Sequence, residues 1–176
     1  MVHADSSNFK ADISKEEAYK QVLEQAEALF EGQRNWEISN LANAASLLWH
    51  AYKSLPSPSK DVNWAGFYVL DPIVSNQLIL GPFQGKVACQ TIKFGKGVCG
   101  TAAERKETVL VEDVEEFPGH IACDGDSKSE IVVPILVGGK TVAIIDVDCA
   151  VVKGFDAVDR EALERLAGLI GGACDW

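Results

Sequence analysis

The feature that most constrains the fold is the segment EIVVPILVGGKTVAIIDVDCAVV, which begins at Glu130. Two runs rich in apolar and β-branched residues flank the pair Gly138 and Gly139. Two consecutive glycines can both adopt positive φ, which is what a two-residue hairpin turn requires. The segment therefore predicts two antiparallel strands joined by a tight turn, and any fold for this chain has to contain them.

Further strands are indicated before this hairpin by aromatic and β-branched content bounded by glycine and proline. They are expected at 63–70, 77–83, 86–94 and 108–114. The residues from 115 to 129 are polar and include Pro118 and Gly119, so they are expected to form a long loop.

Helices are indicated by apolar residues at helical spacing. Ser14 and Glu17 form a capping-box pattern before one helix, and a second begins near Trp36. The segment 95–107 is expected to enter a short helix, and Asp156 is the expected N-cap of a terminal helix. The element order predicts an α+β fold: a central antiparallel sheet with helices packed on one face. A ligand is then expected on the other face, under the long loop.

Composition excludes several classes of function. The formal charge of -10 disfavours binding to nucleic acid or to anionic membranes, both of which need clustered Lys and Arg. The first twenty residues have no apolar run of the kind found in signal peptides, and no stretch is long and apolar enough to span a bilayer. We therefore expect a cytoplasmic protein, with the nucleus as a second compartment.

The domain organisation is expected to be simple. At 176 residues, the chain suits one domain, 1–176, in which 1–35 form an N-terminal helical extension. There is no internal repeat and no low-complexity linker. A sensor module normally accompanies an output domain, and the chain has no room for one.

The five cysteines are an odd number with no C-x-x-C pair, so neither a disulfide framework nor a zinc ribbon is indicated. Cys149 and Cys174 are expected to be packing residues. The other three stand out by position: Cys89 lies in a predicted strand, Cys99 near the start of the predicted short helix, and Cys123 in the long loop. Three thiols around one face suggest either redox chemistry or, with a nearby histidine, a metal site.

Local electrostatics predicts opposite pKa shifts for two of these thiols. The partial positive charge of a helix N-terminus would lower the pKa of Cys99 and favour its thiolate. Cys123 stands beside Asp124, a neighbour that would raise the pKa of its thiol in the free protein. A zinc site that adds His120 is the alternative, but the spacing of the cysteines matches no common zinc pattern, so no metal is expected.

Carboxylates are predicted to gather on the sheet. Asp146 and Asp148 are two residues apart in a strand, so both project from one face, which Ile144 shares. Glu130 begins the adjacent strand and can complete a cluster of three. A solvated sheet face is the simple interpretation. The functional one is a site for a divalent metal or an ammonium group, which carboxylates bind through charge-assisted hydrogen bonds.

Trp64 and Tyr68 are four residues apart in a predicted strand and therefore share a face. Core packing is the simple interpretation for such a pair. The alternative is an apolar wall of a ligand pocket.

These motifs resemble a known family. The hairpin with the helix after it is similar to the C-terminal half of GAF domains, small-molecule sensor modules, and the likeness extends from about Trp36 to the end. One catalytic branch, the free methionine-(R)-sulfoxide reductases, is the more specific match. The segments that carry it are NWAGFYVL, VACQTIKFGKGVCGTAA, GHIACDGDSKSEIVVPI and IIDVD.

This resemblance implies a GAF-like fold with a loop-covered pocket, and reduction of free methionine-(R)-sulfoxide through a cysteine sulfenic acid and an intramolecular disulfide. It assigns the reacting thiols to three positions, with Cys123 expected to attack, Cys89 to form the disulfide, and Cys99 to act as an alternative nucleophile or second resolving thiol. No cofactor is implied beyond an external dithiol, with thioredoxin the expected partner.

The resemblance also assigns the binding residues. Glu130, Asp146 and Asp148 hold the substrate's ammonium, and one of them can protonate the sulfoxide oxygen. For this substrate, the functional interpretation of Trp64 and Tyr68 is an apolar wall for the S-methyl group. A homodimer is expected. A sensor without catalytic activity and a dimerisation module remain the alternatives.

Overall fold

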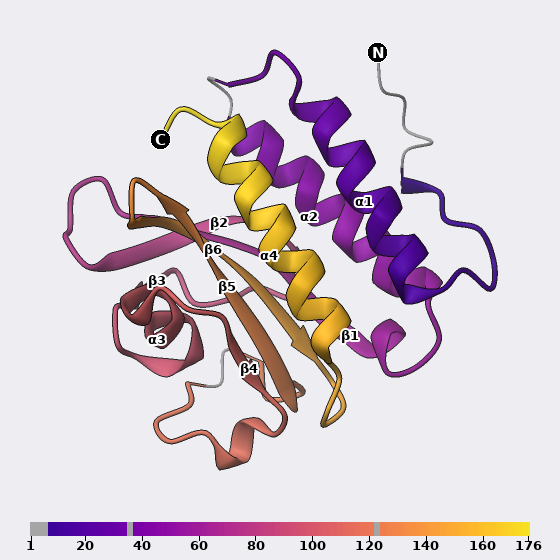
Figure 1. Ribbon diagram of the computed structural model, residues 1–176. Helices are drawn as coiled ribbons and strands as arrows, with labels where there is room; N and C mark the ends of the chain where they lie inside the picture. The colour runs from indigo at the N-terminus through magenta and orange to yellow at the C-terminus, as the bar shows by residue number, and fades with distance from the viewer. Residues whose placement is uncertain (1–6, 35–36, 122–123) are drawn as a thin grey trace.

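The computed structural model describes residues 7–34, 37–121 and 124–176. Its central element is a six-stranded sheet in the order β3-β2-β1-β6-β5-β4, in which every neighbouring pair is antiparallel (Figure 1). The strands are β1 (Val62–Leu70), β2 (Gln77–Gly85), β3 (Thr91–Lys93), β4 (Val109–Val111), β5 (Ser129–Val137) and β6 (Lys140–Cys149). The predicted α+β fold with a central antiparallel sheet is confirmed.

Two helices, α2 (Glu37–Ser54) and α4 (Ala157–Ala173), pack on one face of this sheet, and α1 (Lys15–Phe30) packs against both of them (Figure 1). The helix α3 (Gly97–Arg105) packs on the opposite face, so the prediction that the helices gather on one face was wrong for α3. The short 3₁₀ helices η2 (Ser59–Asp61) and η3 (Val114–Glu116) lie in connections. Within the described ranges, no helix is long and apolar enough to cross a membrane.

The β5–β6 hairpin forms as the sequence predicts. Gly138 and Gly139 have φ of +57° and +74°, the left-handed values that its turn needs. Along β6, Ile145 and Val147 belong to the core under α1, α2 and α4, whereas Ile144 belongs to the second core under α3. This alternation puts the aspartates of β6 on the α3 face.

The predicted capping box at Ser14 and the predicted N-cap at Asp156 are both present, and the second also joins two helices. Ser14 caps α1, and Asp156 caps α4 together with Asp159. The Asp159 carboxylate also accepts hydrogen bonds from Tyr19 Oη at 2.9 Å and Lys15 Nζ at 2.7 Å. The N-terminal helix α1 is therefore fastened to α4 by a buried polar cluster as well as by apolar contacts.

Two predicted strands are shorter than expected. β4 covers only Val109–Val111, and β3 begins at Thr91, so Cys89 precedes the strand rather than lying in it. The backbone before β3 is bonded to side chains of β1: Trp64 Nε1 donates to the carbonyl of Lys86 at 3.1 Å, and Tyr68 Oη donates to that of Cys89 at 3.0 Å. These bonds replace strand pairing and leave Cys89 in a loop over the sheet.

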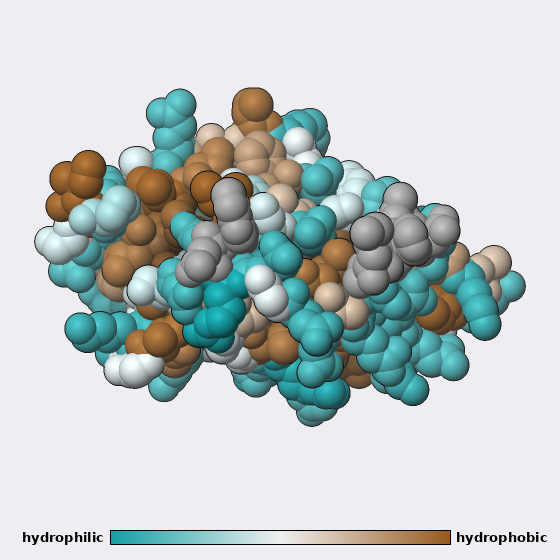
Figure 2. Space-filling view, turned by 90° about the horizontal axis from the view of Figure 1, so that it is seen from above, coloured by the Kyte–Doolittle hydropathy of each residue, from teal (hydrophilic) through white to brown (hydrophobic). Residues whose placement is uncertain are grey.

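Apolar side chains also reach the surface. Large apolar side chains gather on one part of the face drawn in Figure 2. Ile73, at the β1–β2 turn, is 90% exposed, and Ile38, at the start of α2, is 69% exposed. A groove of about 680 Å³ beside them is lined by Ile38, Leu70 and Trp176, among others.

Candidate active site

A cavity of about 300 Å³ lies between α3 and the sheet, on the face predicted to bind a ligand. Its lining includes seven of the eight residues that the sequence singled out: Trp64, Tyr68, Cys89, Cys99, Glu130, Asp146 and Asp148. The eighth, Cys123, lies outside the described residues. Seven residues that are distant in sequence therefore line one cavity.

Strand register brings the three carboxylates together. Glu130 of β5 pairs directly with Asp148 of β6. Asp146 lies two residues before Asp148 in β6, so its side chain is on the same face of the sheet. On the other side of β6, Trp64 pairs with Asp148. Three adjacent strands thus place two aspartates, a glutamate and a tryptophan in one patch of the sheet.

Two of the three carboxylates are buried and Asp148 is partly buried, so the cluster is not a solvated sheet face. Glu130 and Asp146 are only 5% and 6% exposed. Burial raises the pKa of Asp146 and of Asp148 well above the usual range, and the charge of a neighbouring carboxylate raises each further. Asp146 Oδ1 has no hydrogen-bond partner among the described residues. Such a cluster favours a bound cation, because an unpaired buried charge costs free energy.

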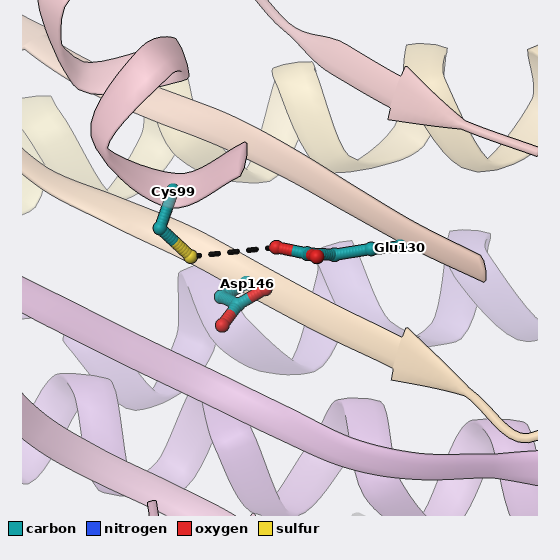
Figure 3. A group of neighbouring side chains, drawn as sticks. All are labelled: Cys99, Glu130 and Asp146. Atoms are coloured by element: carbon teal, nitrogen blue, oxygen red, sulfur yellow. Dashed lines mark hydrogen bonds between the residues drawn. The ribbon is translucent and has the colours of Figure 1, made fainter. Parts of the chain in front are cut away.

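Glu130 stands at the centre of the polar contacts (Figure 3). The Cys99 thiol donates to Glu130 Oε1 over 3.5 Å, and His120 Nε2 lies 3.6 Å from Glu130 Oε2. Burial raises the pKa of Glu130 to about 7, although the nearby His120 side chain acts in the opposite direction. A carboxyl with this pKa is partly protonated at neutral pH and can donate a proton to a ligand.

Cys99 differs from its prediction. It is the third residue of α3, yet it is 6% exposed, and its pKa is raised well above 9.0 by burial and then by the charges of the nearby carboxylates. The expectation that the helix N-terminus lowers this pKa was wrong, because loss of hydration and three like charges outweigh a partial charge. In the free protein Cys99 is a neutral thiol.

The remaining cysteines fall into two groups. Cys89 is disulfide-bonded, whereas Cys99, Cys149 and Cys174 are free and buried. Cys149 and Cys174 belong to the core beneath the helices, where they pack as expected. The predicted pairing of Cys89 with Cys123 stays a prediction, since Cys123 is not among the described residues.

Stacked aromatic rings form the apolar side of the cavity. The Trp64 ring stacks on Tyr68 at 5.9 Å between centroids and on Phe83 at 5.2 Å. Gly66 allows this stack: a Cβ there would lie 2.3 Å from Phe83 Cβ and 2.8 Å from the Trp64 ring. Trp64 and Tyr68 are therefore core residues that also form part of the cavity wall.

Two contributors were not identified from the sequence in these roles. His120 was considered only as a metal ligand, but the structure places it against Glu130. Gly66 had no distinguishing signal beyond being a glycine inside a strand, a position that often marks close approach of another chain segment.

The cavity can bind a small molecule with two unlike ends. The ligand atoms of Cys99, Glu130 and Asp146 all lie within 4.8 Å of one another, so this corner can hold an ammonium group or a metal ion. The rings of Trp64 and Tyr68 offer a surface to an apolar group. A thiol and a partly protonated carboxyl complete a site suited to redox chemistry with proton transfer.

Known proteins resemble this chain over nearly its whole length. A GAF-domain family model matches residues 58–175. A Saccharomyces cerevisiae protein named free methionine-R-sulfoxide reductase is 60% identical over 98% of this chain and 94% of its own. An Escherichia coli protein of the same name is 42% identical, with 88% and 87% covered.

A solved structure is also similar to this chain in fold and sequence. Free methionine-R-sulfoxide reductase from Neisseria meningitidis, in complex with its substrate, superposes with a TM-score of 0.84 at 38% identity, covering 94% of this chain and 93% of that one.

Proposed function

The chain belongs to the GAF-domain family and, within it, to the free methionine-R-sulfoxide reductases, and on this basis we propose that it reduces free L-methionine-(R)-sulfoxide to methionine. The protein is thus an oxidoreductase, and the GAF-like fold expected from the sequence is confirmed. The observation that carries the proposal beyond family membership is the buried carboxylate cluster next to a thiol and stacked aromatic rings.

Glu130, Asp146 and Asp148 bind the α-ammonium of the substrate. A single ammonium offers three N–H donors, and Asp146 Oδ1 is a buried acceptor without a partner among the described residues. Charge-assisted hydrogen bonds are the strong kind, so the cluster contributes much of the affinity. A methionine within a peptide has no ammonium at this position and would leave the carboxylates buried and unpaired. This explains selection of the free amino acid.

The S-methyl end of the substrate lies against Trp64 and Tyr68. Both rings are almost fully buried, at 3% and 1% exposed, and line the same cavity as the carboxylates. The positively polarised sulfoxide sulfur is attracted to the faces of aromatic rings. The substrate is thereby held at both ends, with its sulfur between them.

Glu130 is the proton donor. A cysteine thiolate attacks the sulfoxide sulfur and forms a transient S–S bond. As that bond and the S–O bond of the substrate break, the protonated oxygen passes to the cysteine sulfur, so methionine leaves and the cysteine becomes a sulfenic acid. The sulfoxide oxygen has to be protonated for this step, and a carboxyl with a pKa of about 7 provides the proton near neutral pH. Glu130 recovers the proton that the attacking thiol releases.

The thiols act in sequence. Cys123 attacks, and Cys89 condenses with its sulfenic acid to form a disulfide and water. Cys99 is an alternative nucleophile or a second resolving thiol. Its raised pKa supports the second role in the free protein, since attack requires a thiolate.

An external dithiol completes the cycle. We propose thioredoxin, which exchanges its thiols with the disulfide in the cytosol, and no bound cofactor.

We also propose a homodimer. The exposed apolar side chains around Ile73 and Ile38 support it, because a patch of this kind marks an interaction surface.

The experiment is a substrate panel with dithiothreitol as reductant. Free methionine-(R)-sulfoxide is expected to be consumed with stoichiometric formation of methionine, whereas N-acetylmethionine-(R)-sulfoxide, which lacks the ammonium, is expected to remain. Equal consumption of the acetylated compound would contradict recognition by the carboxylates, and consumption of neither would contradict the function.

A further inference from the structure

We propose that Cys99, Glu130 and Asp146 form a binding site for one Zn²⁺ ion, and that zinc bound there excludes the substrate. The second part rests on the proposed function, because it assumes that the same oxygens hold the substrate's ammonium. The metal site itself depends only on the three side chains and their surroundings (Figure 3).

The spacing of the donor atoms suits a shared ion. Cys99 Sγ lies 3.5 Å from Glu130 Oε1, and the ligand atoms of all three residues are within 4.8 Å of one another. With a Zn–S bond of about 2.3 Å and a Zn–O bond of about 2.1 Å, tetrahedral angles place sulfur and oxygen about 3.6 Å apart. The ion therefore fits between Cys99 and Glu130 with little rearrangement.

A buried acceptor without a hydrogen-bond partner among the described residues favours cation binding. Asp146 is 6% exposed, lines the cavity, and its Oδ1 has no hydrogen-bond partner among the described residues. Buried carboxylates are normally hydrogen-bonded or paired with a cation. The adjacent thiol and glutamate would lose their protons on metal binding, so three anionic ligands would then surround a divalent cation.

The donor set selects zinc over the common hard cations. Calcium and magnesium take oxygen ligands only, whereas sulfur together with carboxylate oxygen suits Zn²⁺. His120 Nε2, 3.6 Å from Glu130 Oε2, is placed to orient that ligand. Three protein ligands leave a fourth position open toward the cavity, which water can fill.

The site does not depend on the redox state of the neighbouring loop. Cys99 is free while Cys89 is disulfide-bonded. Zinc can thus bind without reduction of that disulfide. Since the metal and the ammonium need the same carboxylate oxygens, occupation by zinc is expected to inhibit reversibly and in competition with the substrate.

The test is calorimetric titration of the full chain with zinc chloride alone, in a phosphine reductant that leaves the metal free. One Zn²⁺ per chain is expected. Cobalt(II) in place of zinc is expected to show thiolate-to-metal charge-transfer absorption.

Cys99→Ser and Asp146→Asn should each weaken zinc binding by about tenfold or more. Cys149→Ser, a buried cysteine in the other core, is the matched control and should bind zinc as the wild type does.

Several results would overturn the proposal: no stoichiometric binding, binding that survives Cys99→Ser, or absence of the cobalt thiolate band. Circular dichroism of each variant separates loss of the site from loss of the fold. The two proposals fail independently. Zinc binding without sulfoxide reduction would remove only the proposed function, and full reductase activity without zinc binding would remove only the metal site.

Discussion

Replacing Glu130 by glutamine tests the electrostatics of the cavity without altering its shape. Glu130 is 5% exposed, and burial raises its pKa from 4.5 to about 7. Glutamine has nearly the same size and carries no charge, so it resembles the protonated form at every pH. The variant is therefore expected to stabilise the ligand-free protein at high pH, where the wild type must carry a buried charge.

The sign and size follow from proton linkage. Glu130 binds its proton more tightly when folded, so its contribution to the free energy of unfolding is fully present below the unfolded pKa of 4.5 and is lost as the pH rises through about 7. At about 1.4 kcal/mol per pKa unit, the contribution lost is about 3 kcal/mol. For a chain of this size that corresponds to roughly 6–12 °C in Tm.

The assay is urea unfolding monitored by tryptophan fluorescence, with the reduced wild type and Glu130→Gln compared from pH 5 to pH 9. The free energies of unfolding are expected to be similar at pH 5 and to diverge by pH 9 in favour of the variant. Glu161→Gln, an exposed position on α4, is the matched control and should leave the pH dependence unchanged. Parallel pH curves for wild type and Glu130→Gln would refute a raised pKa and with it the assignment of Glu130 as proton donor.

Three further predictions concern the proposed site and the residues that support it. Asp148→Asn removes a charged acceptor for the ammonium and should raise KM for free methionine-(R)-sulfoxide by roughly 10- to 100-fold, measured in steady-state kinetics; an unchanged KM would contradict that role. Cys123→Ser should abolish turnover while Cys149→Ser retains it, and wild-type rates in Cys123→Ser would remove the nucleophile assignment. Gly66→Ala should destabilise the protein by about 2 kcal/mol in urea unfolding, since its Cβ would overlap Phe83, and unchanged stability would show that the stack relaxes.

Local patterns in the sequence predicted most of the fold. The hairpin around Gly138 and the caps at Ser14 and Asp156 depend on near neighbours, so they were predicted correctly. Period-two alternation also placed Asp146 on the ligand face. These features depend on backbone conformation and spacing, which the sequence expresses directly.

Features that depend on distant contacts could not be predicted. Cys89 was expected in a strand, but it lies in the loop before β3, where its carbonyl accepts a hydrogen bond from Tyr68 Oη of β1. Cys99 was expected to have a low pKa from its helix position alone, whereas its burial and the carboxylates of β5 and β6 determine the actual direction. Both errors have one cause: the packing of α3 and its loop on the sheet is not visible in the local sequence.

The central claim is that a buried acidic cavity holds a lone amino acid while neighbouring thiols reduce it. A single turnover tests this most directly: the fully reduced protein is mixed with excess free methionine-(R)-sulfoxide and no external reductant, and both products are measured by mass spectrometry. One methionine per chain and a disulfide between Cys89 and Cys123 are predicted. Unchanged sulfoxide, or methionine formed while Cys89, Cys99 and Cys123 are all still reduced, would contradict the account.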